Sequence, residues 1–280
     1  MIELKYAYYS ENQKLNIITE YLDKGTLKMK LNEQKIKGKY FDENTLINWF
    51  YQLCLALKYI HSIKCLQKNI TPSNIFLMKD NFAKLGIVGL ENGFIPNIIQ
   101  TKRKVNPYLA PEMRHDEYFT YKSDIWALGT TFYHLIILDY PFEGESFEEM
   151  LRNIESGIMK PIPKDCKIDN QFIEIIKQMM LVNPKERITL NEILDKPIIK
   201  QRIKCYLKEN NFNYSKARKT IEKYDKEYKK EEKFPIIIEN DGEEEKESKK
   251  KEIKENKEIK ERYDLCRHML LIKKIVNVEK

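Results

Sequence analysis

Residues 66–77 read Leu66-Gln-Lys-Asn-Ile-Thr-Pro-Ser-Asn-Ile-Phe-Leu77, a polar loop that leads into a short apolar strand. A long helix is predicted before this stretch, because Asp42 offers an N-cap and apolar residues then return at helical steps. The helical positions are Leu46, Trp49, Phe50, Leu53, Leu57 and Ile60. A second short strand, Ala83-Lys-Leu85, follows the polar turn Lys79-Asp-Asn81. The sequence therefore predicts a buried helix, a loop and a small hairpin in succession.

The flanking segments extend this pattern in both directions. Lys5-Tyr-Ala-Tyr-Tyr9 and Leu15-Asn-Ile-Ile-Thr-Glu-Tyr21 surround a polar turn, which predicts an N-terminal β-hairpin. On the other side, helical spacing recurs at residues 124–137, 146–156, 170–181 and 190–195. The order is hairpin, helix, short strands and then helices, which indicates an α+β fold with a helix-dominated second half.

Charge is distributed unevenly along the chain. The protein has 280 residues, a formal net charge of +7 and 42% hydrophobic residues, enough apolar side chain for a core. Residues 201–280 hold 23 Lys and Arg beside 18 Asp and Glu, a composition that buries too little surface to offset ordering entropy. We expect a charged tail there. Its end, residues 259–276, recovers two apolar helical rows, which favours a short coiled-coil or docking helix.

Several classes of protein are disfavoured by composition. The five cysteines are widely spaced and form no close ligand pair with histidine, so we expect reduced thiols rather than zinc or disulfides. The longest apolar stretch, near residues 125–138, is shorter than the roughly 20 residues of a membrane span, and residues 1–6 do not resemble a signal peptide. Interspersed acids weaken a nucleic-acid footprint in the tail. We expect a cytoplasmic protein with neither a membrane nor a nucleic-acid partner.

Four further segments complete a recognisable series. They are Pro107-Tyr-Leu-Ala-Pro-Glu112, Lys122-Ser-Asp-Ile-Trp-Ala-Leu-Gly129, Tyr140-Pro-Phe-Glu143 and Asn183-Pro-Lys-Glu-Arg-Ile188. Together with the opening stretch they resemble, in register, the catalytic half of a protein kinase, especially of the NIMA-related serine/threonine family. The resemblance implies a protein-kinase-like fold that is mainly the helical large lobe, residues 23–205. Residues 1–22 would be a remnant small-lobe hairpin and hinge, and residues 206–280 the charged tail.

The catalytic positions of that family are altered in this chain. The family's catalytic loop reads His-Arg-Asp, and the resemblance places Gln67, Lys68 and Asn69 there. A carboxylate accepts the substrate hydroxyl proton in the family, whereas an amide is neutral and far too weakly basic near pH 7. The family's loop lysine is replaced by Thr71. We therefore expect no general base in this loop.

Most residues that bind metal and nucleotide in the family are also missing. Asn74 matches a metal-binding position, but Ile87 stands where the family has the Asp that binds Mg²⁺. The 18 residues before Thr19 do not accommodate a Gly-rich loop, a strand lysine and its glutamate partner. Glu20, Leu22 and Phe76 would form a weak remnant of the adenine site. We expect no cofactor, with ATP and Mg²⁺ relevant only if the chain is an active kinase after all.

Residues that hold the family's large lobe together are kept. Glu112 and Arg187 match a buried ion pair, Asp124 matches the carboxylate that binds the backbone of the catalytic loop, and Trp126 matches a packing partner. Asn106 replaces a Thr of the family and is equally well explained as a turn asparagine before Pro107. In the activation-like segment, Thr101 beside three basic residues is a candidate phosphorylation site, although a solvated threonine is the simpler interpretation.

This contrast leads to a pseudokinase hypothesis with two alternatives. The chain keeps the family's structural residues but has lost its catalytic ones. This combination predicts a protein-binding or regulatory module, whose partner would be an active kinase or a cytoskeletal protein. The first alternative is an active serine/threonine kinase, transferring phosphate from ATP, whose gene model is truncated. The second is a structural component of the cytoskeleton, basal body or cilium, which the family resemblance implies. The segment 259–276 would then contribute coiled-coil association.

Overall fold

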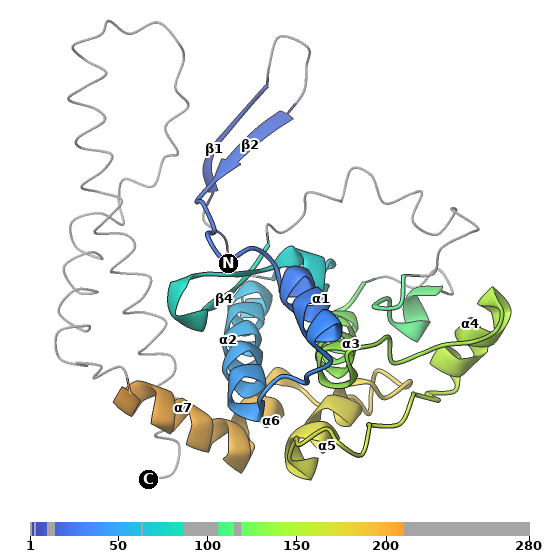
Figure 1. Ribbon diagram of the computed structural model, residues 1–280. Coiled ribbons are helices and arrows are strands. Elements are labelled where there is room, and N and C mark those ends of the chain that lie inside the picture. Colours follow the sequence, from blue (N-terminus) through green and yellow to red (C-terminus); the bar gives the residue numbers. More distant parts are fainter. Residues whose placement is uncertain are drawn as a thin grey trace, which may run out of the picture. The chain divides into compact units, whose positions relative to one another are not determined.

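The computed structural model describes residues 2, 4–9, 15–62, 64–86, 106–114 and 119–209 (Figure 1). The chain forms two compact units, Met1–Arg202 and Ile203–Lys280. Ile87, Thr101 and the segment 259–276 lie outside the described residues. The domain boundaries expected above, after residues 22 and 205, stay predictions.

Two antiparallel hairpins make up the β-structure of the described part, as the sequence predicts. β1 (Leu4–Tyr9) pairs with β2 (Leu15–Thr19). β3 (Ile75–Leu77) pairs with β4 (Ala83–Leu85), so that Phe76 lies opposite Lys84. A 3-10 turn, η2 (Lys79–Asn81), joins the second pair, and another, η1 (Pro72–Asn74), leads into it. The second hairpin therefore directly follows the loop that begins at residue 66.

Helices form the rest of the described structure. They are α1 (Leu27–Lys37), α2 (Glu43–Ser62), α3 (Tyr121–Ile137), α4 (Phe147–Glu155), α5 (Asn170–Met179), α6 (Leu190–Asp195), α7 (Pro197–Glu209) and the 3-10 turn η4 (Pro111–Arg114). The N-cap expected at Asp42 is confirmed, because its Oδ1 accepts from the Thr45 N–H at 2.9 Å. Thr120 and Ser123 form a reciprocal capping box that starts α3.

α1 and α7 are absent from the helices predicted above. Thr26 caps α1 by accepting from the Met29 N–H at 3.4 Å, and Gly38 ends it with a φ of 61°. That left-handed conformation is accessible to glycine without steric cost. α7 runs through residue 205, where the change in composition alone suggested a boundary.

The core of the first unit is organised around α2 and α3. Phe50 of α2 packs edge-to-face on Phe132 of α3 and Phe172 of α5, with ring centroids 5.0 and 5.1 Å apart. All three side chains are fully buried. Truncating such a residue to alanine typically costs about 3 to 5 kcal/mol. This aromatic cluster therefore fixes the helical scaffold that carries the loop at residues 66–74. No helix in the described ranges has both the length and the hydropathy needed to cross a membrane.

Candidate functional site

Asp124, in the first turn of α3, anchors the loop that the sequence singles out. Its carboxylate is almost fully buried and accepts the backbone N–H of Gln67 at 2.9 Å and of Lys68 at 2.8 Å. The His61 Nε2, at the end of α2, lies 2.9 Å from the same carboxylate. The α3 N-terminus, where partial positive charge gathers, also favours a carboxylate. Asp124 thus occupies the place that the resemblance implies, bound to the backbone of the loop.

The loop turns sharply at Lys68. Its φ is 63°, and the Asn69 N–H donates to the Gln67 carbonyl at 2.8 Å, which closes a γ-turn. A positive φ is costly for a residue with a Cβ and persists only where the surroundings enforce it. The two hydrogen bonds to Asp124 enforce it here. The Lys68 Nζ lies 5.7 Å from the centroid of the Phe119 ring.

Asn69 and Asn74 are brought together in this loop. The Asn74 Nδ2 donates to the Asn69 carbonyl at 2.8 Å, and the Gly86 N–H donates to the Asn74 carbonyl at 2.8 Å. A Cβ added at Gly86 would lie 1.8 Å from the Asn74 Oδ1. The Asn74 side chain therefore lies directly against the backbone at the end of β4, where only glycine leaves it room.

Gln67 fills the position where the family has histidine. Its side chain is only 1% exposed, and its Nε2 donates to the Gly86 carbonyl at 3.4 Å. Its Oε1 is buried without a hydrogen-bond partner among the described residues. A buried acceptor without a donor costs free energy. The Gln67 side chain is therefore only partly hydrogen-bonded in its buried position.

Thr71 and Asn106 lie on the walls of a small cavity beside the loop. The cavity is lined in part by Lys68, Asn69, Thr71, Asn106, Phe119 and Asp124. Its volume is about 20 Å³, which is enough for roughly one water molecule. The Asn106 Oδ1 accepts from the Tyr108 N–H at 3.0 Å, the geometry of an Asx-turn, which fits the turn interpretation. Thr71 precedes η1, and its side chain makes no capping hydrogen bond there.

The described residues of this loop offer Mg²⁺ amide oxygens and no carboxylate of their own. Mg²⁺ requires hard oxygen ligands in near-octahedral geometry, most often carboxylates and phosphates. Asn69 and Asn74 contribute amides rather than carboxylates, and the Asn74 Nδ2 donates to a backbone carbonyl, which leaves its Oδ1 as one neutral oxygen ligand. Asp124 has both oxygens bound to the loop backbone and to His61. Within the described ranges no group of three or more His, Cys, Asp and Glu side chains is placed to hold a metal.

The proposed remnant of the adenine site is joined to β4 by an ion pair. The Lys84 Nζ lies 2.8 and 2.7 Å from the two carboxylate oxygens of Glu20. Phe76, half-buried, forms an isolated backbone bridge with Thr26, while Leu22 is also half-buried. The segment that contains the hinge-like residues therefore continues into α1 along the edge of β3. These contacts place Glu20, Leu22 and Phe76 in one region of the lobe.

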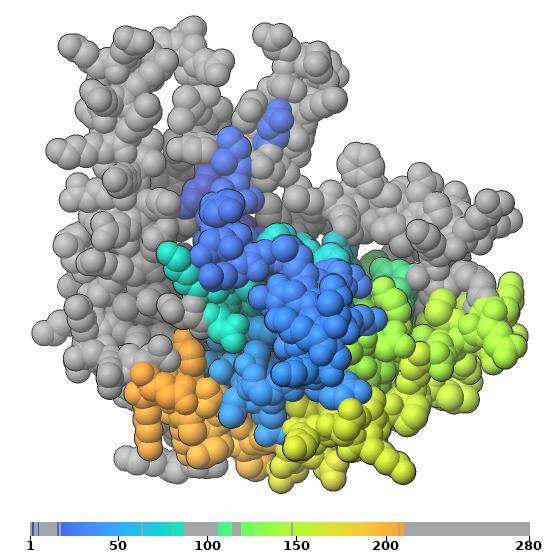
Figure 2. Space-filling model, viewed as in Figure 1, coloured from blue at the N-terminus to red at the C-terminus, as the bar shows by residue number. Residues whose placement is uncertain are grey.

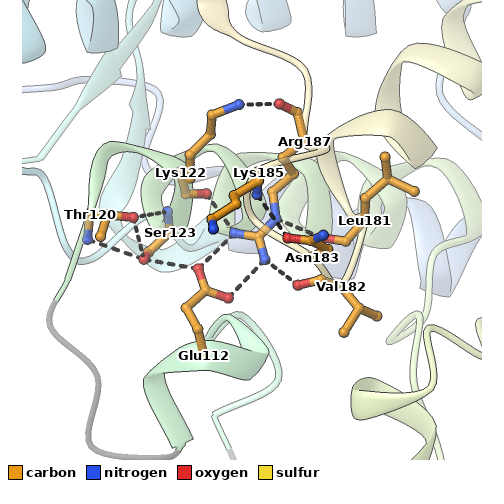
Figure 3. A network of polar contacts seen from close by, with 9 residues as sticks. All are labelled: Glu112, Thr120, Lys122, Ser123, Leu181, Val182, Asn183, Lys185 and Arg187. Atoms are coloured by element: carbon orange, nitrogen blue, oxygen red, sulfur yellow. Dashed lines mark hydrogen bonds and ion pairs between the residues drawn. The ribbon is translucent and has the colours of Figure 1, made fainter.

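Glu112 and Arg187 form a bidentate ion pair in the interior (Figure 3). The guanidinium Nη1 and Nη2 each lie 2.7 Å from one oxygen of Glu112. The Ser123 hydroxyl donates to the Glu112 Oε1 at 3.1 Å. Burial raises the pKa of Glu112, but hydrogen bonds and charge from Arg187 outweigh this and leave the pKa lowered. The pair therefore stays ionised and joins η4 to the turn before α6.

The guanidinium of Arg187 is saturated by further contacts. It donates to the carbonyls of Lys122, Leu181 and Val182 at 2.9, 2.7 and 3.0 Å, as Figure 3 shows. It also lies 5.0 Å from the centroid of the Trp126 ring, and Trp126 stacks on Phe142. Fully hydrogen-bonded buried charges avoid the desolvation cost of an isolated ion. Arg187 and Trp126 are thus parts of one packed network.

The contacts of three residues of the site were not predicted from the sequence. His61, at the end of the predicted helix, contacts Asp124, which the helical spacing alone did not predict. Lys84 was predicted only as part of a short strand, and its pairing with Glu20 was not predicted. Gly86 matched no glycine motif, although its missing Cβ makes room for Asn74. The available signal for His61 was its position at the C-terminus of the helix that leads into the loop.

Comparisons with known proteins agree with the geometry. Residues 1–199 match the protein kinase domain. The serine/threonine-protein kinase Nek1 of Mus musculus is 33% identical over 218 residues, which are 77% of this chain and 18% of that protein. Nek5 of Homo sapiens is 34% identical over 203 residues, which are 71% of this chain and 28% of Nek5. The chain therefore spans less than a third of the length of these relatives.

Proposed function

The chain belongs to the protein kinase domain family, with Nek kinases among its relatives, and from this premise we propose that it is a pseudokinase. In this role the large lobe binds a protein partner and does not transfer phosphate. The observation that carries the proposal is the amide at Asn69, in a loop whose backbone is held by Asp124 in the way a kinase scaffold requires.

The chemistry at Asn69 supports this role. Phosphoryl transfer by a kinase depends on a carboxylate that accepts the proton of the substrate hydroxyl. Loss of a general base alone lowers the rate by a factor of about 10² to 10⁴, or about 3 to 5 kcal/mol of barrier. Thr71 in place of the loop lysine removes a cation near the transferring group. These losses act on one transition state and are not additive.

The internal hydrogen bonds of the loop point the same way. The Asn74 Nδ2 donates to the Asn69 carbonyl, so one side of this amide holds the loop together and only its Oδ1 is left to face a metal. The Asn74 Oδ1 lies against Gly86, in space that a Cβ would otherwise fill. The loop is therefore stabilised by interactions that need neither metal nor nucleotide.

A phosphotransfer assay with radiolabelled ATP and Mg²⁺ tests the proposal on the full chain. We expect no phosphate transfer to generic protein substrates or to the chain itself above the background of an Asn69→Ala variant. A parallel thermal-shift titration with ATP and Mg²⁺ is expected to leave the unfolding temperature unchanged. An active kinase assayed alongside checks the reagents.

The alternative of an active serine/threonine kinase predicts the opposite result. Phosphate transfer that disappears in both Asn69→Ala and Asn74→Ala would overturn the pseudokinase proposal, because it would assign chemistry to the loop. ATP-dependent stabilisation without transfer would keep the proposal and add a nucleotide-binding scaffold. Transfer that persists in both variants would indicate a contaminating kinase.

A further inference from the structure

α1 exposes apolar side chains on the face opposite its buried face. Leu27 and Leu31 are fully buried, whereas Met29 is 56% exposed and Ile36 is 87% exposed. Because an α-helix advances 100° per residue, residues seven apart lie within about 20° of the same line. Met29 and Ile36 therefore form one outward stripe, roughly opposite Leu27 and Leu31. A surface helix of a monomeric domain normally has a single apolar face.

Lysines border this stripe on both sides. By the same helical geometry Lys28 and Lys35 lie on one side, and Lys30 and Lys37 lie on the other. Figure 2 shows the outer surface of α1 on the side of the molecule that faces the viewer. The pKa of Lys28 is lowered mainly by burial and to a lesser degree by the charge of Lys35, and its Nζ lies 5.8 Å from the centroid of the Tyr140 ring. The apolar stripe thus has a basic border.

Neighbouring carboxylates compensate only part of this charge. Glu33, the acidic residue of α1, pairs with Lys30 at 2.9 Å. Asp139 lies 3.6 Å from Lys35, but its shorter contact, 2.7 Å, is to Lys160. The helix carries four lysines and one glutamate, so its outer face is basic overall.

We propose that this outer face of α1 docks an acidic amphipathic helix of a partner protein. A partner helix with apolar residues at heptad spacing would cover Met29 and Ile36, and carboxylates on either side of its seam would meet the four lysines. The spacing of seven residues on α1 is the repeat by which two helices pack side by side. This inference names a surface for the partner binding proposed above, and it rests on that proposed function.

The dimensions of α1 favour a helix over a lipid surface. Its 11 residues extend about 16 Å, which presents one heptad of contact and leaves two large apolar side chains to be covered. Glu33 beside the stripe pairs with Lys30, and binding to a lipid surface scales with the apolar area buried, of which two side chains supply little. A partner helix instead allows Lys30 and Lys37 to pair with its carboxylates. Anionic lipid and nucleic acid are accordingly the competing outcomes of the test.

Fluorescence anisotropy with a designed peptide tests the docking face. The probe is a labelled, end-capped peptide of about 21 residues with Leu at the a and d positions and Glu at e and g. We expect the wild-type chain to bind it, with weaker binding when NaCl rises from about 0.05 to about 0.5 M. Met29→Ser combined with Ile36→Ser should weaken binding at least tenfold, roughly the loss of one interface hot spot.

Two further variants separate charge from folding effects. Lys35→Glu with Lys37→Glu should also weaken binding at least tenfold, because it places repulsive charge on both borders of the stripe. The matched control, Ile158→Ser with Lys164→Glu, changes an exposed apolar residue and a lysine outside α1 and should bind like wild type. Equal unfolding temperatures of all variants show that each is folded.

The outcomes are distinct. Absence of peptide binding by the wild-type chain, or binding that the α1 variants leave unchanged, overturns the docking face. Binding of phosphatidylserine vesicles or of poly-uridine RNA that depends on α1, without peptide binding, reassigns the face and also overturns the proposal. Neither result bears on phosphate transfer, since the variants leave the loop at residues 66–74 intact. Phosphate transfer, in turn, would overturn the pseudokinase role and leave the docking result standing.

Discussion

At the scale of single residues, Asp124 separates the shape of the catalytic loop from its chemistry. Its oxygens bind the peptide N–H groups of Gln67 and Lys68, and not their side chains. The γ-turn at Lys68 is therefore formed whatever side chains stand at positions 67 and 69. In this chain those side chains are amides, which accept and donate hydrogen bonds but are far too weakly basic to remove a proton near pH 7.

The ion pair between Arg187 and Glu112 gives the first prediction. Arg187→Met should lower the free energy of unfolding by about 3 to 5 kcal/mol, because it leaves a buried carboxylate without its partner. Urea denaturation at pH 7 measures the change. Lys30→Met, which removes an exposed pair with Glu33, should cost at most about 1 kcal/mol. Similar losses for both variants would contradict the interior role of Arg187.

A second prediction concerns Gly86 and Asn74. Gly86→Ala should destabilise the protein by about 1 to 3 kcal/mol, since the new Cβ would displace the Asn74 side chain and break its bond to Asn69. In an Asn74→Ala background the same substitution should cost less, because the clash is gone. A double-mutant cycle followed by urea denaturation measures this coupling. Strictly additive costs would show that the two residues do not touch.

At the scale of elements, the strands and the long helices could be predicted and α1 could not. α2, α3 and α5 have a buried face with regular spacing, and the pattern reveals it. α1 has Leu27 and Leu31 on one side and Met29 and Ile36 on the other, so its apolar residues give no single periodic face. Its start and end are set by Thr26 and Gly38, whose signals are short and local.

The pair Lys84–Glu20 gives a prediction about the first hairpin. Glu20 directly follows β2, and its bond to Lys84 joins that strand to β4. Lys84→Met should speed amide hydrogen exchange in β2 (Leu15–Thr19), because local opening of the hairpin no longer breaks a partly buried ion pair. Hydrogen exchange with mass spectrometry measures this. Exchange in α2 is the internal control and should stay unchanged, whereas uniform acceleration would indicate global destabilisation.

At the scale of the whole molecule, acid should destabilise the protein first through His134. Burial, aided by the charges of Lys28 and Lys35, lowers the pKa of His134 to about 3. The unfolded chain binds a proton below about pH 6.5 and the folded protein does not, so stability is complete above that pH and falls below it. The slope approaches about 1.4 kcal/mol per pH unit. Glu112, whose pKa is lowered, adds a second loss only below about pH 4.3.

His134→Gln separates these two steps. The variant should lose less stability than wild type as the pH falls from about 6.5 to about 3, the folded pKa of His134, and it should match wild type in the steepness of the loss only below that pH. Chemical denaturation at a series of pH values measures both slopes. Parallel curves over the upper range would show that His134 does not stay neutral in the folded protein.

The residue types of the candidate site, the Glu112–Arg187 pair and the binding of the loop backbone by Asp124 could be predicted from the family resemblance, whereas other contacts could not. The residue types at positions 67, 69 and 71 can be compared directly with a family motif. The contact between Asn74 and Gly86, twelve residues apart, depends on how β4 ends beside η1, and local patterns do not encode that approach. The same holds for the Tyr108 hydroxyl, which lies 2.8 Å from the His134 Nδ1. Such pairings follow from packing rather than from spacing along the chain.

The anchoring of peptide groups by Asp124 has an evolutionary consequence. Every amino acid except proline offers the same N–H group, so substitutions at positions 67 and 68 leave the anchors intact. Selection can therefore preserve the backbone shape of the loop without also preserving catalytic activity. Side chains in the loop can thus change while the backbone shape that Asp124 sets is retained.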